Sequence, residues 1–180
     1  MIIGITGTNG AGKGTIVDFL VTTKGFNHFS ARAFITQEVE RRSLPVDRTH
    51  MREVANDLRK AHGPSYVAEQ LMAQALVAKG DSVVESIRTP GEAKYIKSQG
   101  AILWAVDADT PIRYERVQKR MSETDKVTFD QFKEFQEKEL HGTEEWDMNV
   151  FAVMKMADHV YQNNGSLEEL CTQVEKVLEV

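Results

Sequence analysis

The feature that most constrains the fold is a glycine-rich loop, Gly7 to Thr15, which directly follows a short apolar run. The loop satisfies the pattern G-x-x-x-x-G-K, which functions between a β-strand and the first turn of an α-helix. Ile2, Ile3 and Ile5 supply the strand, and Thr15 to Val21 begin the helix. Glycines allow successive N–H groups to face one point, and the helix end adds positive potential. We therefore expect a phosphate-binding cradle here.

The composition fits one globular domain spanning residues 1–180. The net charge of −5 excludes a protein that coats nucleic acid through a general basic field. The apolar run Ile102 to Val106 is far too short to cross a membrane. A single cysteine cannot form an internal disulfide, and no basic segment precedes an apolar stretch at Met1. We expect a cytoplasmic protein whose partners are small molecules, not nucleic acid or membranes.

Beyond the loop, β-prone runs alternate with helical segments. Strands are predicted at 26–29, 83–84, 102–106 and 159–161. Helices are predicted at 30–42, from Asp47, at 66–77, after Thr89-Pro90, after Thr110-Pro111, from Thr128 and from Ser166. This alternation predicts an α/β protein with a five-stranded, mostly parallel sheet, helices on both faces and ligands at the carboxyl ends of the strands.

Within the loop, Lys13 is positioned to bridge the outer phosphates of a bound nucleotide. The residue after this lysine is Gly14, where a serine or threonine is usual, and the hydroxyl comes one residue later, at Thr15. Position 14 therefore cannot ligate Mg²⁺ directly. The alternative to a phosphate cradle is a chance glycine-rich turn.

The string Gly10-Ala11-Gly12-Lys13-Gly14-Thr15 resembles the P-loop of adenylate kinases and other nucleoside monophosphate kinases. Asn9 stands where adenylate kinases commonly have proline. The resemblance implies a three-layer P-loop NTPase fold, ATP as phosphoryl donor, and Mg²⁺ held largely through water. It also implies that ATP contacts Thr8, Asn9, Gly10, Ala11, Gly12, Lys13, Gly14 and Thr15.

A second segment, V-V-E-S-I-R-T-P at 83–90, places a carboxylate at the end of a buried strand and a guanidinium three residues on. It resembles the V-V-I-D-G-I-R-S segment of a dephospho-CoA kinase-like, adenylate-kinase-related family of P-loop proteins. The resemblance implies that Glu85 organises Mg²⁺ through water, together with Thr15, and that Arg88 binds phosphate. The alternative for Glu85 is an ordinary strand-end carboxylate.

A third segment, R-E-V-A-N-D-L-R-K-A-H-G-P at 52–64, resembles the E-V-A-x-x-L-R-x-x-x-G-P stretch of the same family. In such kinases this region builds the acceptor pocket, here within a helical region of approximately 30–80. The resemblance makes Arg59, Arg32, Arg48 and Arg88 candidates to hold an acceptor phosphate. The alternative for Arg59 is a solvated charge on a helix surface.

Arg113, Arg116 and Arg120 follow one another at spacings of three and four, which aligns them along one side of a helix. The segment resembles the R-Y-E-R-V-x-x-R entry into the lid of these kinases, and a short helical lid is expected at approximately 120–142. The resemblance implies that Arg116 and Arg120 close over the donor phosphates, although the family has a further arginine where Met121-Ser122 stands. An ion-paired surface helix is the alternative.

The loop N-N-G-S-L-E-E-L at 163–170 resembles the segment near the donor adenine in dephospho-CoA kinases and their relatives. The resemblance places Asn164 and Gly165 beside ATP. Because Asn-Gly is a common turn pair, a simple turn before the last helix is equally consistent with these residues.

Together these features predict ATP-dependent phosphoryl transfer to a small nucleotide-type acceptor, most simply a nucleoside monophosphate. Lys13, Glu85, Arg88, Arg116 and Arg120 are the predicted catalytic residues. One alternative is transfer to a ribose hydroxyl, as in dephospho-CoA kinases, with Glu85 as the general base. Another is an ATP-binding regulatory module with little turnover. A GTPase is disfavoured because no Asn-Lys-x-Asp motif occurs in the sequence.

Overall fold

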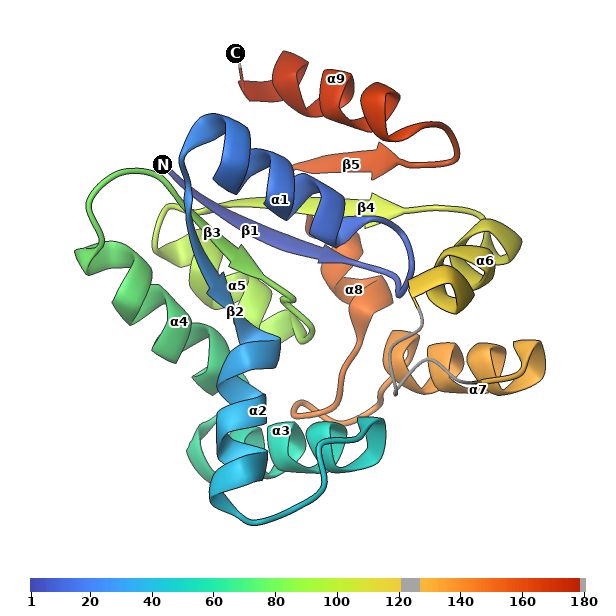
Figure 1. The fold of residues 1–180 in the computed structure, drawn as a ribbon. Coiled ribbons are helices and arrows are strands. Elements are labelled where there is room, and N and C mark those ends of the chain that lie inside the picture. Colours follow the sequence, from blue (N-terminus) through green and yellow to red (C-terminus); the bar gives the residue numbers. More distant parts are fainter. Residues whose placement is uncertain (121–126, 179–180) are drawn as a thin grey trace.

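The structure, a computed structural model, describes residues 1–120 and 127–178 and contains one five-stranded sheet (Figure 1). The strand order is β2-β3-β1-β4-β5, and every neighbouring pair is parallel. The strands are β1 (Ile2–Gly7), β2 (Asn27–Ser30), β3 (Ser82–Glu85), β4 (Ile102–Asp107) and β5 (His159–Gln162). The predicted α/β fold is confirmed, and the sheet is parallel throughout the described residues.

Helices connect the strands and extend beyond them. They are α1 (Lys13–Lys24), α2 (Ala31–Arg41), α3 (Arg48–His62), α4 (Tyr66–Val77), α5 (Pro90–Ser98), α6 (Thr110–Arg120), α7 (Phe129–Leu140), α8 (Val150–Met154) and α9 (Leu167–Leu178). Helix α8 was not predicted, because five residues carry too little periodicity to reveal a helix. No helix in the described part of the chain combines the length and apolarity needed to cross a membrane.

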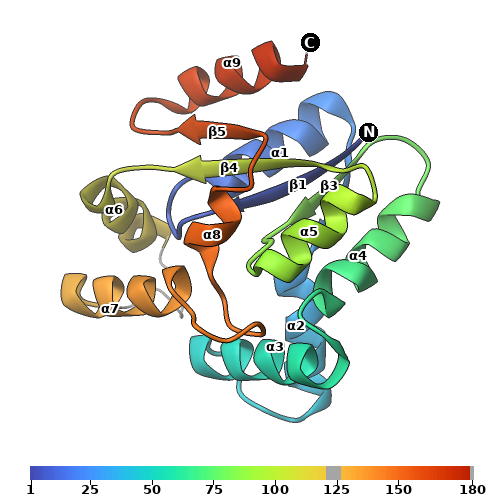
Figure 2. The same ribbon diagram turned by 180° about the vertical axis from the view of Figure 1, so that it is seen from behind.

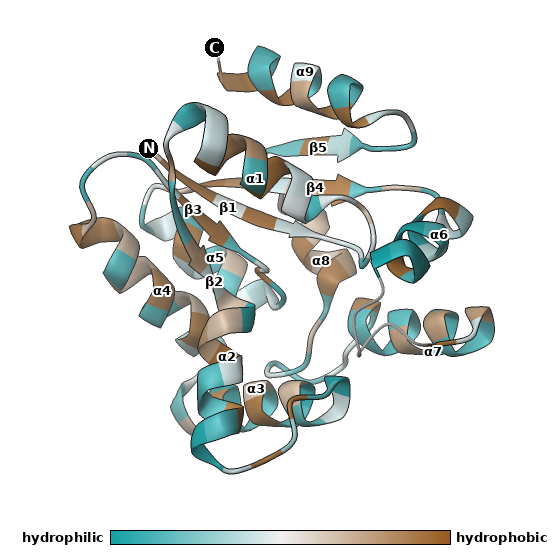
Figure 3. Cartoon of the chain, in the orientation of Figure 1, coloured by the Kyte–Doolittle hydropathy of each residue, from teal (hydrophilic) through white to brown (hydrophobic). Residues whose placement is uncertain are grey.

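Helices cover both faces of the sheet, which gives three layers. Helices α1 and α9 lie on one face, and α4, α5 and α8 lie on the other (Figures 1 and 2). Side chains alternate along each strand. Val83 and Trp104 therefore pack in the core beside α1 and α9, whereas Val84 and Leu103 pack in the opposite core. In Figure 3 the hydrophobic colour accordingly concentrates on the central strands.

Most of the predicted helix caps are present. The side chains of Asp47, Thr89 and Thr128 each accept a hydrogen bond from a backbone N–H of the helix that follows. Ser166 and Glu169 form the predicted capping box, in which the side chain of each residue accepts a hydrogen bond from the backbone N–H of the other.

The start of α6 differs from the expectation by one residue. The backbone N–H of Arg113 donates to the carbonyl of Asp109 at 3.0 Å, so the helix begins at Thr110 and not after it. The Thr110 hydroxyl instead accepts from Nη2 of Arg113 at 2.9 Å. A capping threonine would accept a hydrogen bond from a backbone N–H of the first turn, whereas the Thr110 hydroxyl accepts one from the guanidinium of Arg113.

The predicted helical region at 30–80 contains two different structures. Helix α4 packs against β2 and β3 and belongs to the layer that covers the sheet. Helices α2 and α3 extend away from the carboxyl ends of the strands, and we call this pair the helical arm (Figure 1). Part of the predicted lid, residues 121–126, lies outside the described residues. Helix α7 forms most of the remaining part of the predicted lid. It lies beside α3 of the helical arm (Figures 1 and 2).

Candidate active site

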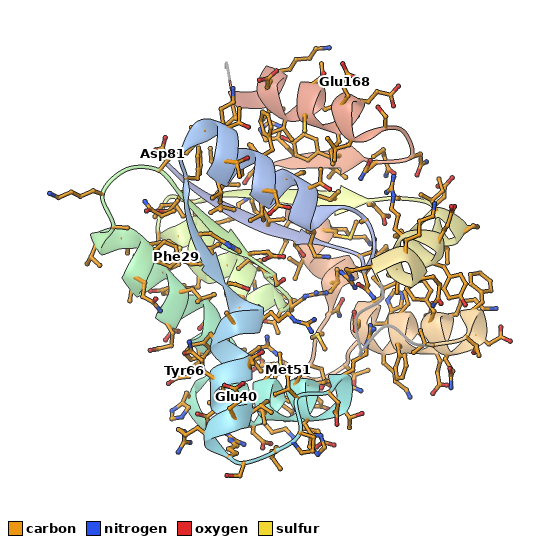
Figure 4. The ribbon with its side chains drawn as sticks, viewed as in Figure 1. Phe29, Glu40, Met51, Tyr66, Asp81 and Glu168 are labelled. Carbon is orange, nitrogen blue, oxygen red and sulfur yellow. The ribbon has the colours of Figure 1, made fainter. Side chains whose placement is uncertain are left out.

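One cavity of about 1110 Å³ lies at the carboxyl ends of the strands, between the glycine loop, the helical arm, α6 and α7. Figure 4 draws the side chains of these elements and labels Met51 of the helical arm, which lines the cavity. It brings together most of the residues predicted to form the site. These are Asn9, Gly10, Gly12, Lys13, Gly14, Thr15, Arg32, Arg48, Arg59, Glu85, Arg88, Arg116, Arg120 and Gly165. Among the described lining residues, Thr8, Ala11 and Asn164 do not appear. Segments far apart in the sequence therefore share one cavity.

The glycine loop is backed closely by other elements. Gly12 has a φ of 107°, and a Cβ added there would lie 2.3 Å from Nδ2 of Asn163. Asn163 is buried, and its Nδ2 donates to the carbonyl of Ala11 at 2.8 Å. At Gly10, with a φ of 81°, a Cβ would lie 2.4 Å from the backbone oxygen of Arg113. The loop therefore keeps a conformation that side chains at these two positions would disrupt.

Lys13 is folded back onto its own loop. Its Nζ donates to the carbonyl oxygens of Gly7 at 2.9 Å and Thr8 at 2.8 Å. Burial, followed by the positive charge of Arg88, lowers the pKa of Lys13 to about 7. A phosphate in the cradle would supply the negative charge that favours the protonated amine.

Two of the residues predicted to bind ATP have structural partners. The Thr8 hydroxyl donates to Oδ1 of Asp107 at 2.6 Å, which ties the loop to the end of β4. Oδ1 of Asn164 accepts from the backbone N–H of Asp109 at 2.9 Å. These contacts account for both side chains without a ligand, and their role in ATP binding stays a prediction.

The end of β3 places Glu85 and Arg88 on the cavity wall. Ser86, between them, has a φ of 73°, a left-handed conformation uncommon for serine. Oε2 of Glu85 lies 3.1 Å from Nε2 of His28 on β2. Burial favours the neutral carboxyl, but the hydrogen bond with His28 and the charge of Lys13 outweigh it and lower the pKa of Glu85. Glu85 is therefore an anion, and its partner His28 on β2 could not be predicted from the sequence of β3.

Glu139 of α7 is a cavity residue that the sequence analysis missed. Its carboxylate pairs with the guanidinium of Arg48, and its Oε2 lies 3.7 Å from Nη1 of Arg88. Arg48 also stacks on the ring of Phe135, 5.0 Å from the centroid. Burial favours the neutral carboxyl, but Arg48 and Arg88 outweigh it and lower the pKa of Glu139. The carboxylate of Glu139 thus lies between two arginines, in a position that would also attract an anionic ligand.

Arg59 is buried, so the interpretation of Arg59 as a solvated helix charge is wrong. The side chains of Arg59 and Glu92 are both 1% exposed. Nε and Nη2 of Arg59 lie 2.9 and 2.8 Å from Oε1 of Glu92. Oε2 of Glu92 accepts from the backbone N–H of Arg88 at 2.7 Å and of Thr89 at 3.2 Å. This carboxylate joins α3 to the chain segment that carries Arg88.

The three aligned arginines of α6 have different environments. Arg113 is buried and does not line the cavity; its Nε donates to the carbonyl of Ala108 at 2.7 Å. Arg116 lines the cavity and donates to the carbonyl of Asn163 at 2.8 Å. Nη2 of Arg120 lies 3.4 Å from Oδ1 of Asn9 in the loop. Arg116 and Arg120, the pair that the sequence favoured, are the two that face the cavity.

The cavity is strongly basic although the chain has a net charge of −5. Nine lysine and arginine residues line it, against four aspartate and glutamate residues. In the described part of the chain, no group of three or more His, Cys, Asp or Glu could hold a metal ion. The basic lining therefore fits a polyanion, and the roles of Thr15 and Glu85 toward Mg²⁺ stay predictions.

Replacing Glu139 by glutamine should weaken the fold and strengthen nucleotide binding. Without the carboxylate, Arg48 and Arg88 lose a partner, at a cost of about 2 kcal/mol for these partly exposed groups. The same loss removes a competing anion, so affinity for ATP should rise about tenfold. Thermal melts and calorimetric titration with ATP measure the two effects. Unchanged ATP affinity would mean that Glu139 does not compete with the nucleotide.

A strand, a glycine loop with a buried lysine and a basic cavity at the strand ends define a P-loop nucleotide-binding protein with a kinase-like fold. Residues 3–142 match the family model described as an AAA domain, and the chain belongs to this family.

The chain is also similar over nearly its whole length to archaeal proteins of one kind. It is 28% identical to UPF0200 protein PH1008 of Pyrococcus horikoshii, over 99% of this chain and 96% of that protein. It is 28% identical to UPF0200 protein TK1334 of Thermococcus kodakarensis, with 99% and 97% covered.

Solved structures share the fold at low sequence identity. TT1252 from Thermus thermophilus matches with a TM-score of 0.64 at 22% identity, covering 99% of this chain and 96% of that one. Shikimate kinase from Aquifex aeolicus matches with a TM-score of 0.59 at 15% identity, covering 99% and 96%. These matches show the fold, and the structural neighbours include small-molecule kinases.

Proposed function

We propose that this protein is an ATP-dependent phosphotransferase whose acceptor is a nucleoside monophosphate. The observation that carries the proposal is the single cavity with two groups of cations. Lys13, Arg116 and Arg120 line it beside the glycine loop, and Arg32, Arg48 and Arg52 line it on or beside the helical arm. A donor triphosphate fits the first group and an acceptor phosphate fits the second, with Arg88 lining the same cavity.

The roles of the residues follow from phosphoryl transfer itself. An oxygen of the acceptor phosphate forms a bond to the γ-phosphorus of ATP while the bond to the bridging oxygen breaks, leaving ADP. The transition state is largely stabilised by positioning and by cations around the transferred group. Backbone N–H groups from Gly10 to Thr15 hold the donor, and Lys13 and Arg88 neutralise the group in transfer. Bound Mg²⁺ would supply additional neutralisation of the outer phosphates.

The state of Glu85 favours a phosphate acceptor over a hydroxyl acceptor. A hydroxyl must lose a proton, and an effective general base has a pKa near the working pH. The hydrogen bond with His28 and the charge of Lys13 keep the pKa of Glu85 below its ordinary value despite burial. Such a carboxylate is a weak base. An acceptor phosphate is already ionised at neutral pH and needs no base.

A nucleotide-dependent regulatory module is the second candidate. The observation that favours it is the pairing of Glu139 with Arg48 and Arg88, in which a carboxylate of the protein itself engages two arginines of the cavity. A module of this kind would bind ATP and transfer phosphate to nothing, whereas an enzyme consumes ATP when its acceptor is present.

A transfer screen tests the proposal. Purified protein is incubated with Mg²⁺ and ATP and with each of the nucleoside monophosphates, dephospho-CoA or shikimate, and products are identified by mass spectrometry. We expect a nucleoside diphosphate and stoichiometric ADP from at least one monophosphate. Phosphorylation of dephospho-CoA or shikimate alone would identify a hydroxyl acceptor. ATP binding without any transfer would favour the regulatory module.

A further inference from the structure

Two unpartnered polar atoms lie on α3, in residues that line the cavity. The first belongs to Asn56. Its Nδ2 donates to Oδ1 of Asp147 at 2.7 Å, which fixes the orientation of the amide because a carboxylate can only accept. Its Oδ1 is buried, and no described residue donates to it. Oδ1 of Asn56 is therefore a hydrogen-bond acceptor of fixed direction to which no described residue donates.

The second atom belongs to Arg59. Glu92 accepts from Nε and Nη2 of Arg59 and matches its charge. Nη1 is buried and has no hydrogen-bond partner in the described residues. Because Glu92 compensates the charge, the remaining Nη1 acts as a directional hydrogen-bond donor more than as an anchor for a phosphate.

The two atoms have opposite polarity and come from neighbouring positions. Residues three apart on an α-helix lie on the same face, with about 5–6 Å between their Cβ atoms. Asn56 and Arg59 both line the acceptor side of the cavity, together with Met51 of the same helix. Buried polar groups in native proteins are normally hydrogen-bonded, so an acceptor and a donor left together point to a ligand.

We propose that Asn56 and Arg59 read the base of the acceptor nucleotide, and that they select cytosine or adenine, whose amino group at C4 or C6 lies beside an unprotonated ring nitrogen. The amino group donates to Oδ1 of Asn56, and the adjacent ring nitrogen accepts from Nη1 of Arg59. This inference rests on the proposed function, because it assumes that an acceptor nucleotide enters this side of the cavity.

The pattern excludes the corresponding keto bases. Uracil and hypoxanthine present a carbonyl and a ring N–H, so acceptor would face acceptor and donor would face donor. Asn56 cannot correct the mismatch by turning its amide, because Asp147 holds Nδ2. A well-placed bidentate contact of this type discriminates by about tenfold or more. Oδ1 of Asn56 and Nη1 of Arg59 are both covered in this structure, so side chains must shift as the base enters. Two flexible methionines, Met51 and Met148, line the cavity.

Calorimetric titration with two matched pairs of monophosphates tests the inference. CMP and UMP differ in one amino or keto group, and AMP and IMP differ in the same way. At least one pair should show about tenfold tighter binding of the amino member to the full-length protein. Equal affinities in both pairs, tighter binding of the keto members, or no binding of any of the four would overturn the inference.

Variants separate base reading from a structural role. Asn56→Ala should bring the affinity ratio within the preferred pair toward one, and Asp147→Ala should do the same by removing the acceptor that holds Nδ2 of Asn56. Asp57→Ala is the matched control, because Asp57 lies next to Asn56, has a side chain that is 58% exposed, and pairs with Arg42. A ratio that survives both Asn56→Ala and Asp147→Ala in folded protein would refute the assignment.

A crystal structure of the CMP or AMP complex, whichever binds more tightly, gives a direct check. The amino group is expected within hydrogen-bond distance of Oδ1 of Asn56. Finding Nη1 of Arg59 on Oδ1 of Asn56 with the base elsewhere would show that the two atoms serve each other. Failure of the proposed function is distinguishable: amino-selective binding without phosphoryl transfer would contradict the kinase and leave the base reading intact.

Discussion

Replacing Lys13 by methionine is expected to reduce phosphoryl transfer by about 10²- to 10³-fold, the usual effect of removing one charged donor from a transferring group. Methionine preserves the length of the side chain and removes its charge. ADP formation with the best acceptor from the transfer screen measures the loss. The affinity for ATP should fall as well, because in the proposed function Nζ of Lys13 contacts the donor phosphates.

The same change should stabilise the empty protein. Burial and Arg88 lower the pKa of Lys13 from 10.5 to about 7, so keeping this group costs on the order of 4 kcal/mol at pH 7. Loss of the hydrogen bonds to Gly7 and Thr8 offsets about 2 kcal/mol of that gain. The melting temperature should therefore rise by about 5 °C.

The pH dependence of this gain identifies its cause. Between pH 7 and pH 10.5 the unfolded chain binds a proton at Lys13 that the folded chain does not, so the wild-type protein gains stability as the pH rises. The advantage of the variant should be largest at or below pH 7 and shrink toward pH 10. Lys24→Met, on the same helix but 34% exposed and paired with Glu175, is the control. Full transfer activity of Lys13→Met would refute the role of Lys13.

The sequence predicted the features that depend on neighbouring residues. The loop from Gly7 to Thr15, the alternation of strands and helices, and caps such as Asp47 and Thr89 are each encoded within a few positions. The parallel sheet then follows, because right-handed crossovers bring the carboxyl ends of the strands to one edge. The meeting of Lys13, Glu85 and Arg88 in one cavity could be predicted for this reason.

The parts that were missed depend on contacts between distant segments. Glu139 meets Arg48 across 91 residues, and His28 meets Glu85 across 57 residues. Glu139 lies in a helix rich in acidic residues, where no spacing distinguishes it from solvated neighbours. Periodicity could not show that Arg59 is buried, because its partner Glu92 belongs to another helix. The electrostatic balance of the site is thus set by tertiary packing.

Replacing Glu92 by glutamine should produce the largest loss of stability among the changes considered. The carboxylate accepts from Arg59 and from the backbone N–H groups of Arg88 and Thr89. Glutamine can keep an oxygen toward the backbone, but its amide nitrogen then faces the donors of Arg59. A buried arginine without its anion costs about 3–5 kcal/mol. Chemical denaturation should show this loss, with a melting temperature lower by about 10 °C.

A double variant shows whether the loss comes from the uncompensated charge. Adding Arg59→Met to Glu92→Gln removes the buried cation and keeps an aliphatic side chain in its place, so at least half of the lost stability should return. The alternative cause is the capping box, in which Glu92 serves the first turn of α5 through Thr89. A double variant no more stable than Glu92→Gln would assign the loss to this cap. Glu92 also holds the backbone N–H of Arg88, and both variants lack this carboxylate. If the double variant recovers stability but phosphoryl transfer by folded protein stays low, the loss of transfer comes from the placement of Arg88 and not from the stability of the ion pair.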